Sequence, residues 1–494
     1  MKEISYEILA QHGPNAKDKW TAIDGVVYDV SNFAHPGGDA LVERLMGKDG
    51  SAQYSKAHPK DLVQKVLGMR VVGKLTGEKP KEQTSAAQGS SGRGEKPDVS
   101  TMINSFDFEA IARETLPDEA WHYYSSGADD EICLRENRAA FSRIRLRPRI
   151  LVDVKNIDMS TSISGIKSSL PLYLTATALG KLAHDDGELA ITRAAHKAGV
   201  IYMLPTLSSC TVDEMLAARA PGQPVFSQLY VNSDRSRTQA YVEKLAQSGV
   251  KGLFVTVDAP QLGRREKDMR NKFVKSTSDV QKGDSVKRDE GVTRAISSFI
   301  DPSLNWKDIP WLIKVAKGMP VYLKGVQCAE DAVLAYEHGL QGVVLSNHGG
   351  RQIDSARSGI EVLAEVMPAL RSIPGYSPEK FQVYVDGGIR RGADIFKAVA
   401  LGATAVGIGR PVLYSLASFG QEGIERMIQI FKDELEMTMR LMGTPTIKDI
   451  NGKFVLPHGL TDVSGAAVRD FLQEATYEPL QTQAKRVGYS NSRL

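Results

Sequence analysis

Polar side chains and glycines gather at the ends of a series of short apolar runs between residues 170 and 411. The side chains with chemical functions at those ends are Tyr230, Asp258, Lys324, His348, Arg351, Asp386, Arg390 and Arg410, and the glycines are Gly387, Gly388 and Gly409. If the runs are parallel strands of a barrel, their carboxyl ends meet on one face, so we expect these residues to share one site. A structural role could explain any one of them, but coincidence explains the whole set poorly.

This set contains what the oxidation of a 2-hydroxy acid requires. His348, in the sequence SNHGG, is the expected base that removes a proton from the substrate, because the pKa of imidazole suits that task. Asp258 would orient the imidazole and stabilise its cationic form. Arg351 follows His348 by three residues and would hold the substrate carboxylate in a bidentate fork.

Other members of the set indicate a flavin nucleotide. Lys324 would lie against the pyrimidine end of a flavin and stabilise the negative charge of its reduced form. DGGIRRGAD and GIGRP follow the last two apolar runs, where barrels commonly bind phosphate through backbone N–H groups and a helix N-terminus. Glycine permits a close approach there, and Arg390 and Arg410 add positive charge.

A second kind of site is indicated near the N-terminus by His35 and His58. A single histidine is usually structural, but these two lie 23 positions apart in a block too small to be an enzyme by itself. Pro36, Gly37 and Gly38 follow His35, and the missing side chains would let a flat macrocycle approach the backbone. Two imidazoles on opposite faces would fill both axial positions of a haem iron, which suits the transfer of single electrons.

The apolar runs predict the strands of a (β/α)8 TIM barrel. They read LPLYLTATAL, VIYMLPTL, PVFSQLYV, GLFVTVDAP, PVYLKGV, GVVLSNHGG, QVYVDGGI and AVGIGRP, and helical stretches such as GELAITRAAHKAG follow them. Continuous apolar strands that alternate with helices indicate a parallel sheet covered by helices, and eight such units close into a barrel. A doubly wound sheet is the alternative, but no GxGxxG sequence follows the first run.

Changes in composition and hydrophobic pattern along the 494 residues predict four segments. Residues 1–77 form a small α+β haem block, 78–100 a flexible linker with almost no large apolar residue, 101–462 the barrel and 463–494 a polar tail. A charged insertion between Gly263 and Phe299 interrupts the barrel pattern. We give equal weight to a lid and to a solvated loop without a role.

Composition excludes several classes of function. The net charge of +3, with 42% hydrophobic and 24% charged residues, is typical of a soluble globular protein, and the basic residues form no stripe that would indicate nucleic-acid binding. The sequence contains no run of about 18 apolar residues, so no membrane span is predicted. The three cysteines are too far apart to indicate a disulfide framework or a metal site.

The first block resembles the cytochrome b5 family over nearly its whole length. Trp20, the sequence VVYDVSNFAHPGG and the position of the second histidine carry the resemblance. It implies that His35 and His58 are the axial ligands of haem b.

Residues from about Phe106 to Gly443 resemble the FMN-dependent 2-hydroxy-acid dehydrogenase and oxidase family. The shared motifs are AWHYYSSGADDE, QLYVNSDR, FVTVDAPQLGRREKDM, SNHGGRQ and VDGGIRRGADIFKA. The resemblance implies FMN as cofactor and a homo-oligomer, a tetramer as in the family. It also implies that Tyr123 helps to bind the substrate carboxylate and lies toward the haem domain, that Tyr230 contacts the substrate hydroxyl, and that Arg265 joins Arg351. The flavin contacts that it implies are Thr177, Gln228, Thr256 and Ser346.

The same resemblance suggests the substrate. Ala178 and Leu207 would surround the substrate side chain, and leucine stands where glycolate oxidases usually carry tryptophan. The smaller residue leaves room for a methyl group, so we expect L-lactate, oxidised to pyruvate. Pro205 occupies the position of a flavin-contacting serine, so one hydrogen bond to the cofactor is expected to be missing.

The electron acceptor and the location in the cell are less determined. The main hypothesis passes electrons singly from FMN to the haem and on to an acceptor such as cytochrome c. One alternative is an oxidase that reduces oxygen, and another is a non-catalytic haem electron carrier, against which the intact set of site residues argues. The first residues lack a presequence pattern, and Ser492, Arg493 and Leu494 are a variant of the peroxisomal address. We expect a peroxisomal protein, with the mitochondrial intermembrane space or the cytoplasm as alternatives.

Overall fold

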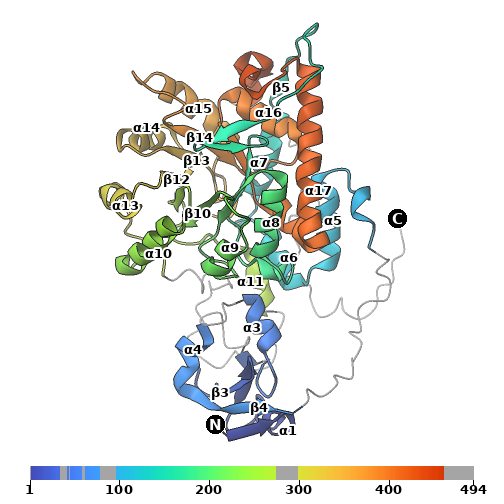
Figure 1. Ribbon diagram of the computed structural model, residues 1–494, viewed down its shortest axis with the longest axis vertical. Coiled ribbons are helices and arrows are strands. Elements are labelled where there is room, and N and C mark those ends of the chain that lie inside the picture. The colour runs from blue at the N-terminus through green and yellow to red at the C-terminus, as the bar shows by residue number, and fades with distance from the viewer. Residues whose placement is uncertain are drawn as a thin grey trace.

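The computed structural model describes residues 2–33, 42–43, 45–57, 62–77, 96–273 and 299–460. His35 and His58 lie outside the described residues, as do most of the predicted linker, residues 274–298 of the insertion, and the tail with its terminal Ser492-Arg493-Leu494. Figure 1 shows two parts, a small N-terminal unit and a larger body that contains the barrel.

The N-terminal unit is built on a four-stranded sheet in the order β1-β4-β3-β2. Its elements are β1 (Lys2–Ser5), α1 (Tyr6–Ala10), β2 (Trp20–Ile23), β3 (Val26–Asp29), α3 (Ser51–Ala57), α4 (Leu62–Leu67), the 3-10 helix η1 (Gly68–Arg70) and β4 (Val71–Thr76). Asp24 and Gly25 join β2 to β3 with φ angles of 49° and 77°, as a tight hairpin requires. Tyr28, Val63 and Leu67 are buried in a small apolar core between the sheet and the helices.

The body is a closed barrel of eight parallel strands, which confirms the predicted TIM barrel. The strands are β8 (Leu172–Leu174), β9 (Ile201–Leu204), β10 (Val225–Leu229), β11 (Leu253–Thr256), β12 (Val321–Val326), β13 (Gly342–Leu345), β14 (Gln382–Asp386) and β15 (Ala405–Ile408). Each pairs in parallel with its neighbours, and β15 pairs with β8 to close the circle. All eight predicted runs contain one of these strands.

Nine helices follow the strands in the described residues and cover the barrel (Figure 1). They are α8 (Glu188–Ala198), α9 (Val212–Ala217), α10 (Arg235–Gln247), α11 (Glu266–Phe273), α13 (Ile309–Val315), α14 (Ala329–Glu337), α15 (Gly359–Arg371), α16 (Gly392–Leu401) and α17 (Arg410–Met442). The 3-10 helices η3 (Gly180–Leu182), η5 (Trp306–Asp308), η6 (Ile447–Asp449), η7 (Gly452–Phe454) and η8 (His458–Leu460) lie in the connections. Several helices begin with a capping box. At α15, the side chains of Ser358 and Glu361 each accept a hydrogen bond from the other residue's backbone N–H group.

Additional elements pack around the barrel and cover the amino ends of its strands. The 3-10 helix η2 (Val99–Thr101) and the helices α5 (Ser105–Thr115), α6 (Asp118–Ser125) and α7 (Ile132–Ser142) precede it, and α5 packs along α17. The hairpin of β6 (Thr161–Ile163) and β7 (Ile166–Ser168) covers the amino end of the strands, where Tyr322 donates a hydrogen bond to Ser164 Oγ at 2.6 Å. A short sheet pairs β5 (Arg145–Leu146) with β16 (Val455–Leu456).

Side chains alternate in direction along each strand, and this alternation divides the core into two layers. Inward-facing aromatic residues fill the barrel, among them Tyr173, Phe254, Tyr322 and Tyr384, and the rings of Phe254 and Tyr322 stack with centroids 4.5 Å apart. Outward-facing aliphatic residues pack under the helices in one large cluster. The filled interior leaves the carboxyl ends of the strands as the place where a cavity can form.

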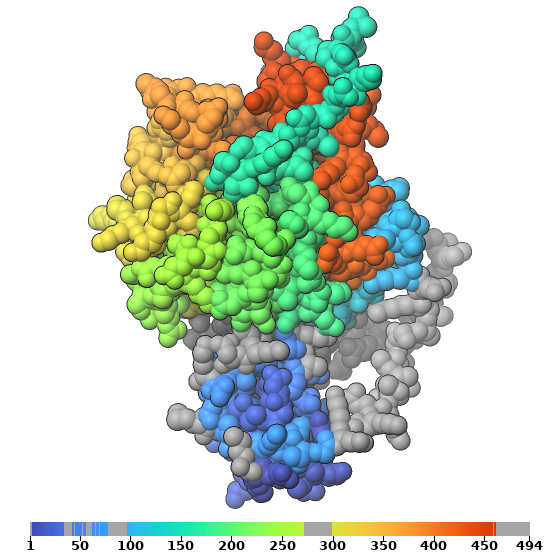
Figure 2. All heavy atoms as spheres, viewed as in Figure 1, coloured from blue at the N-terminus to red at the C-terminus, as the bar shows by residue number. Residues whose placement is uncertain are grey.

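The N-terminal unit lies beside that end of the body. Its helix α3 contacts η3, the turn that follows β8. Figure 2 shows the unit as a separate lobe next to the barrel. None of the helices in the described ranges is long and apolar enough to cross a bilayer.

Candidate active site

A cavity opens at the carboxyl ends of the strands and brings together nearly all of the predicted barrel residues. Those that line it are Tyr123, Thr177, Ala178, Leu207, Gln228, Tyr230, Thr256, Arg265, Lys324, His348, Arg351, Asp386, Gly387, Gly388, Arg390, Gly409 and Arg410. Asp258 and Ser346 stand directly behind this lining and bond to His348. Pro205 also lines the cavity.

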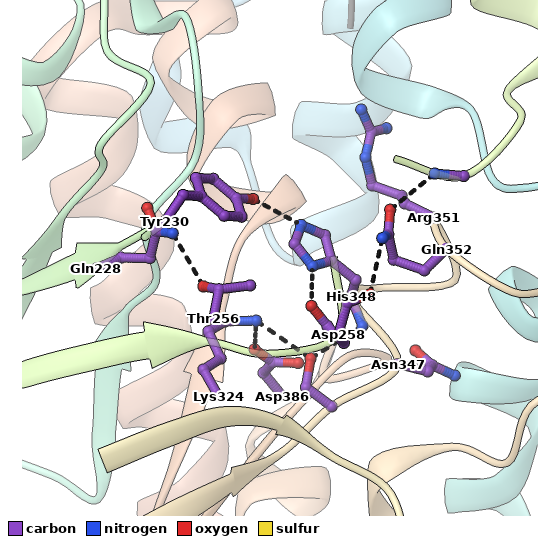
Figure 3. Close-up of polar contacts among 12 residues, drawn as sticks. Gln228, Tyr230, Thr256, Asp258, Lys324, Asn347, His348, Arg351, Gln352 and Asp386 are labelled. Carbon is purple, nitrogen blue, oxygen red and sulfur yellow. Dashed lines mark hydrogen bonds and ion pairs between the residues drawn. The ribbon is translucent and has the colours of Figure 1, made fainter. Parts of the chain in front are cut away.

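His348 and Asp258 form a close, shielded pair (Figure 3). His348 Nδ1 lies 2.8 Å from Asp258 Oδ1, and the Asp258 side chain is only 2% exposed. The carboxylate therefore selects the tautomer in which Nδ1 donates and Nε2 can accept a proton. The Tyr230 hydroxyl lies 3.4 Å from that Nε2. His348 has a φ of 59°, a strained backbone conformation that aims its ring into the cavity.

Burial determines the charge state of this pair. It lowers the pKa of His348 below its ordinary value, and the nearby Asp258 offsets only part of that effect. Burial alone would raise the pKa of Asp258, but His348 and Lys324 outweigh it and hold that pKa below its usual range. Near neutral pH the site thus contains a neutral imidazole and an ionised carboxylate, which is the state that a general base requires.

A glycine that the sequence analysis did not single out makes room for Asp258. Gly325 has a φ of 111°, and a Cβ there would lie 2.5 Å from the Asp258 side chain. The pairing of β12 with β13 shifts register between Lys324 and Val326. Lys324 therefore lies inside β12, not after it as predicted, because the strand continues past this irregularity. An isolated glycine within a strand was the available signal.

Two arginines give one side of the cavity its positive charge. Arg351 Nη1 donates to the carbonyl oxygens of Tyr123 at 2.8 Å and Ser126 at 2.9 Å, so its position is fixed by backbone. Arg265 Nε donates to the Arg351 carbonyl at 3.4 Å. Burial, followed by the charge of Arg351, lowers the pKa of Arg265 to about 9. An anion bound between the two guanidinium groups would relieve this repulsion.

Lys324 supplies a positive charge at the floor of the cavity. Its Nζ lies 3.0 Å from Asp386 Oδ2 and 3.2 Å from Ser346 Oγ (Figure 3). Burial opposes its charge, but Asp386 and Asp258 raise the pKa of Lys324 above its ordinary value. The amine therefore remains protonated beside the cavity.

Polar groups on β10, on β11 and in the loop after β8 also face the cavity. Gln228 Nε2 donates to Thr256 Oγ1 at 2.9 Å, and both residues line the cavity. Thr177 Oγ1 is buried and has no hydrogen-bond partner in the described part of the chain. A buried hydroxyl without a partner at a cavity wall is expected where a polar ligand completes its bonding.

The far end of the cavity combines glycines with cations. Gly387 and Gly388 have φ angles of 86° and 85°, and a Cβ on Gly388 would lie 1.8 Å from the Asn137 carbonyl oxygen. Arg390 Nη1 pairs with Glu109 Oε2 at 2.8 Å. Arg410 donates to carbonyl oxygens of Tyr124, Ser126 and Gly349, so its nitrogens also hold neighbouring segments in place.

Helices before the barrel contribute lining residues that the sequence analysis missed. Tyr124, Asn137 and Arg138 line the cavity from α6 and α7. The side chains of Asn137 and Asn347 exchange two hydrogen bonds of 2.8 Å. For Asn137 the available signal was a polar residue inside a helix, where asparagine is intrinsically unfavourable.

The two predicted haem ligands, His35 and His58, lie outside the described residues. The described ranges hold no group of three or more His, Cys, Asp or Glu side chains placed to bind a metal ion.

Comparison with known proteins covers both parts of the chain. Residues 112–457 match the family described as FMN-dependent dehydrogenase, and residues 5–76 match the cytochrome b5-like haem/steroid binding domain. The chain is 47% identical over 495 aligned residues to an L-lactate dehydrogenase (cytochrome) of Wickerhamomyces anomalus, with 98% of this chain and 85% of the relative covered. It is 44% identical to the glycolate oxidase of Spinacia oleracea, with 71% of this chain and 94% of the relative covered. Among solved structures, a mutant flavocytochrome b2 with pyruvate bound matches with a TM-score of 0.69 at 43% identity, covering 80% of this chain and 96% of that one.

Proposed function

Because the chain belongs to the FMN-dependent dehydrogenase family and carries a cytochrome b5-like domain before the barrel, we propose that it is an L-lactate dehydrogenase of the cytochrome-linked type. It oxidises L-lactate to pyruvate with FMN and passes the electrons through haem b to a one-electron acceptor such as cytochrome c. The observation that carries the proposal is the match to a protein of that activity over 98% of this chain.

The cavity fits FMN. Lys324 offers a cation to the flavin ring, and the unpartnered hydroxyl of Thr177 offers a hydrogen bond. Gly387, Gly388 and Arg390 line the far end of the cavity, where backbone N–H groups and a cation suit a phosphate. When bound, FMN supplies the two-electron acceptor for the substrate.

The chain's own side chains hold the substrate and move its proton. Arg351 and Arg265 bind the carboxylate, since their two charges converge in a buried site. The Tyr230 hydroxyl, next to His348 Nε2, contacts the substrate hydroxyl, and Tyr123 assists at the carboxylate. His348 takes a proton from the substrate, and Asp258 balances the charge that the imidazole gains.

The two walls that meet the substrate side chain are Ala178 and Leu207. Both are apolar and of modest size, which suits the methyl group of lactate. The margin over glycolate should be modest, because one methylene in an apolar pocket contributes about 1–3 kcal/mol.

The N-terminal part of the chain distinguishes the dehydrogenase from the oxidase alternative. The glycolate oxidase of Spinacia oleracea covers only 71% of this chain, whereas the cytochrome-linked relative covers both parts. Contact of α3 with η3 brings the N-terminal unit next to the loop that carries Ala178. His35 and His58 are the proposed axial ligands of the haem iron.

The organisation and location of the protein complete the proposal. Residues 1–77 form the haem domain, 78–100 a linker, 101–462 the catalytic barrel and 463–494 a tail. We infer a homotetramer from the family resemblance and a peroxisomal location from Ser492-Arg493-Leu494.

Anaerobic stopped-flow spectroscopy tests the function directly. On mixing with L-lactate, the flavin band should bleach first and the haem band should respond afterwards. In His58→Ala, haem should be lost and reduction of cytochrome c should collapse, while flavin bleaching and reduction of a small artificial acceptor persist. Haem that stays oxidised in the anaerobic run, together with oxygen consumption by the aerated enzyme and L-lactate, would support the oxidase instead. A flavin that no 2-hydroxy acid bleaches would refute both.

A further inference from the structure

A buried carboxylate outside the cavity joins two loops of the barrel rim. Glu188, the first residue of α8, is 0% exposed. Its Oε1 accepts hydrogen bonds from Gly180 N at 2.8 Å and Ser209 N at 3.0 Å, and its Oε2 accepts one from Cys210 N at 3.2 Å. These three backbone N–H groups and the amino end of α8 compensate its charge.

The two loops that Glu188 joins carry the walls of the substrate pocket. Gly180 lies in the loop after β8, two residues beyond Ala178, and Ser209 lies in the loop after β9, two residues beyond Leu207. Two further hydrogen bonds connect the loops on either side of the carboxylate. Leu179 N donates to Leu207 O at 3.3 Å, and Lys181 N donates to Ser209 Oγ at 3.2 Å.

Among the described residues, the side chains of the two walls pack in different apolar clusters. Ala178 packs against the large cluster between the strands and the helices. Leu207 packs instead against a separate small cluster of Tyr230, Ala259 and Ile300. The distance between the two walls therefore depends on the polar bridge, and the carboxylate is its centre.

The local backbone is shaped for this bridge. A Cβ at Gly180 would lie 3.0 Å from the carboxyl carbon of Glu188, so glycine allows the carboxylate to reach the loop. Gly187, immediately before Glu188, has a φ of 48° that turns the chain into α8. Glu188 itself is absent from the residues that line the cavity.

We propose that Glu188 is a positioning residue that fixes the separation of Ala178 and Leu207 and thereby limits the size of the 2-hydroxy acid side chain that the enzyme accepts. The inference rests on the proposed function and deepens it. It predicts that specificity changes when a residue that does not touch the substrate is replaced.

Glu188→Gln tests this inference with little change of shape. In either orientation its amide NH2 faces a backbone N–H, so at least one of the three bonds is lost. Values of kcat/KM should be measured for glycolate, L-lactate and L-mandelate. We expect the mandelate-to-lactate ratio to rise about tenfold, the lower end of what one methylene of space is worth. The pH profile for lactate should keep its acid limb, because His348 is unchanged.

Glu214→Gln is the matched control. Glu214 is a carboxylate in the first turn of the next helix, α9, and accepts hydrogen bonds only from Thr211 of its own capping box among the described residues. Its replacement should lower the melting temperature without changing the mandelate-to-lactate ratio. An equal rise in both variants would mean that general loosening, and not the bridge, controls specificity.

Ser209→Ala supplies a second, milder test because it removes the bond that Ser209 Oγ accepts from Lys181 N and keeps the three backbone bonds of Glu188. The ratio should rise in the same direction, about threefold for one weak hydrogen bond. If Glu188→Gln does not fold, this variant decides the question. An unchanged ratio in every folded variant of the bridge overturns the inference alone, whereas a wild-type protein inert toward all three acids overturns the proposed function together with it.

Discussion

Asp258→Asn should slow proton removal and also move its pH dependence. Asp258 Oδ1 lies 2.8 Å from His348 Nδ1, and the carboxylate is almost fully shielded from solvent. Asparagine keeps the shape and an acceptor oxygen but removes the charge that balances the imidazolium. Loss of one member of a buried, hydrogen-bonded charge pair costs about 2–5 kcal/mol, which corresponds to a decrease of about 30- to 5,000-fold in kcat/KM.

The direction of the pH effect follows from the neutral form of His348 being the active base. In the wild type, kcat/KM should be constant above the pKa of His348 and fall about tenfold per pH unit below it. Burial already lowers that pKa, and Asp258 opposes the decrease. Removing the carboxylate charge therefore lowers the pKa further, so the acid limb of the variant should move to lower pH while its plateau falls.

Anaerobic flavin reduction by L-lactate, followed by stopped flow between about pH 4.5 and 9, measures both effects. Asp308→Asn is a suitable control, because Asp308 pairs with Arg235 at 3.2 Å and does not line the cavity. The control variant should leave the rate of flavin reduction and the acid limb of the pH profile unchanged. An Asp258→Asn enzyme with the wild-type plateau, or with its limb displaced to higher pH, would refute the assignment of the pair.

Three further variants test other parts of the site. His348→Gln should reduce flavin reduction by about 100- to 10,000-fold with FMN still bound, and near-normal turnover would remove His348 from its role. Leu207→Ala should raise kcat/KM for L-mandelate relative to L-lactate by about 10- to 200-fold; a wild type that already prefers mandelate would contradict the lactate assignment. Arg390→Gln should weaken FMN binding to the apoprotein by about 10- to 150-fold in a fluorescence titration, because a hydrogen bond to a charged group contributes about 1.5–3 kcal/mol. Arg391→Gln, which changes the neighbouring arginine outside the cavity lining, should not weaken it.

The barrel could be predicted from the sequence because its signals are local. Parallel strands that are covered on both sides must be apolar throughout, so each one stands out as a short run between helices. The side chains that follow such runs must meet at one rim, and this placed Tyr230, Asp258, His348 and Arg351 in one site before any distance was known. Motifs such as SNHGG and VDGGIRRGAD also indicate the family, whose FMN and haem b cofactors agree with the matches over both parts of the chain.

Tertiary structure alone decided which groups complete that site. Asn137 meets Asn347, and Glu109 meets Arg390, across more than 200 residues of sequence. Neither pairing has a local pattern that periodicity could detect. Similarly, the three groups that donate hydrogen bonds to the Glu188 carboxylate are backbone N–H groups. Every residue except proline has such a group, so side-chain types do not reveal the bridge. Sequence specifies residue types and local periodicity, whereas the distances that set charge state and pocket size arise only when distant segments pack together.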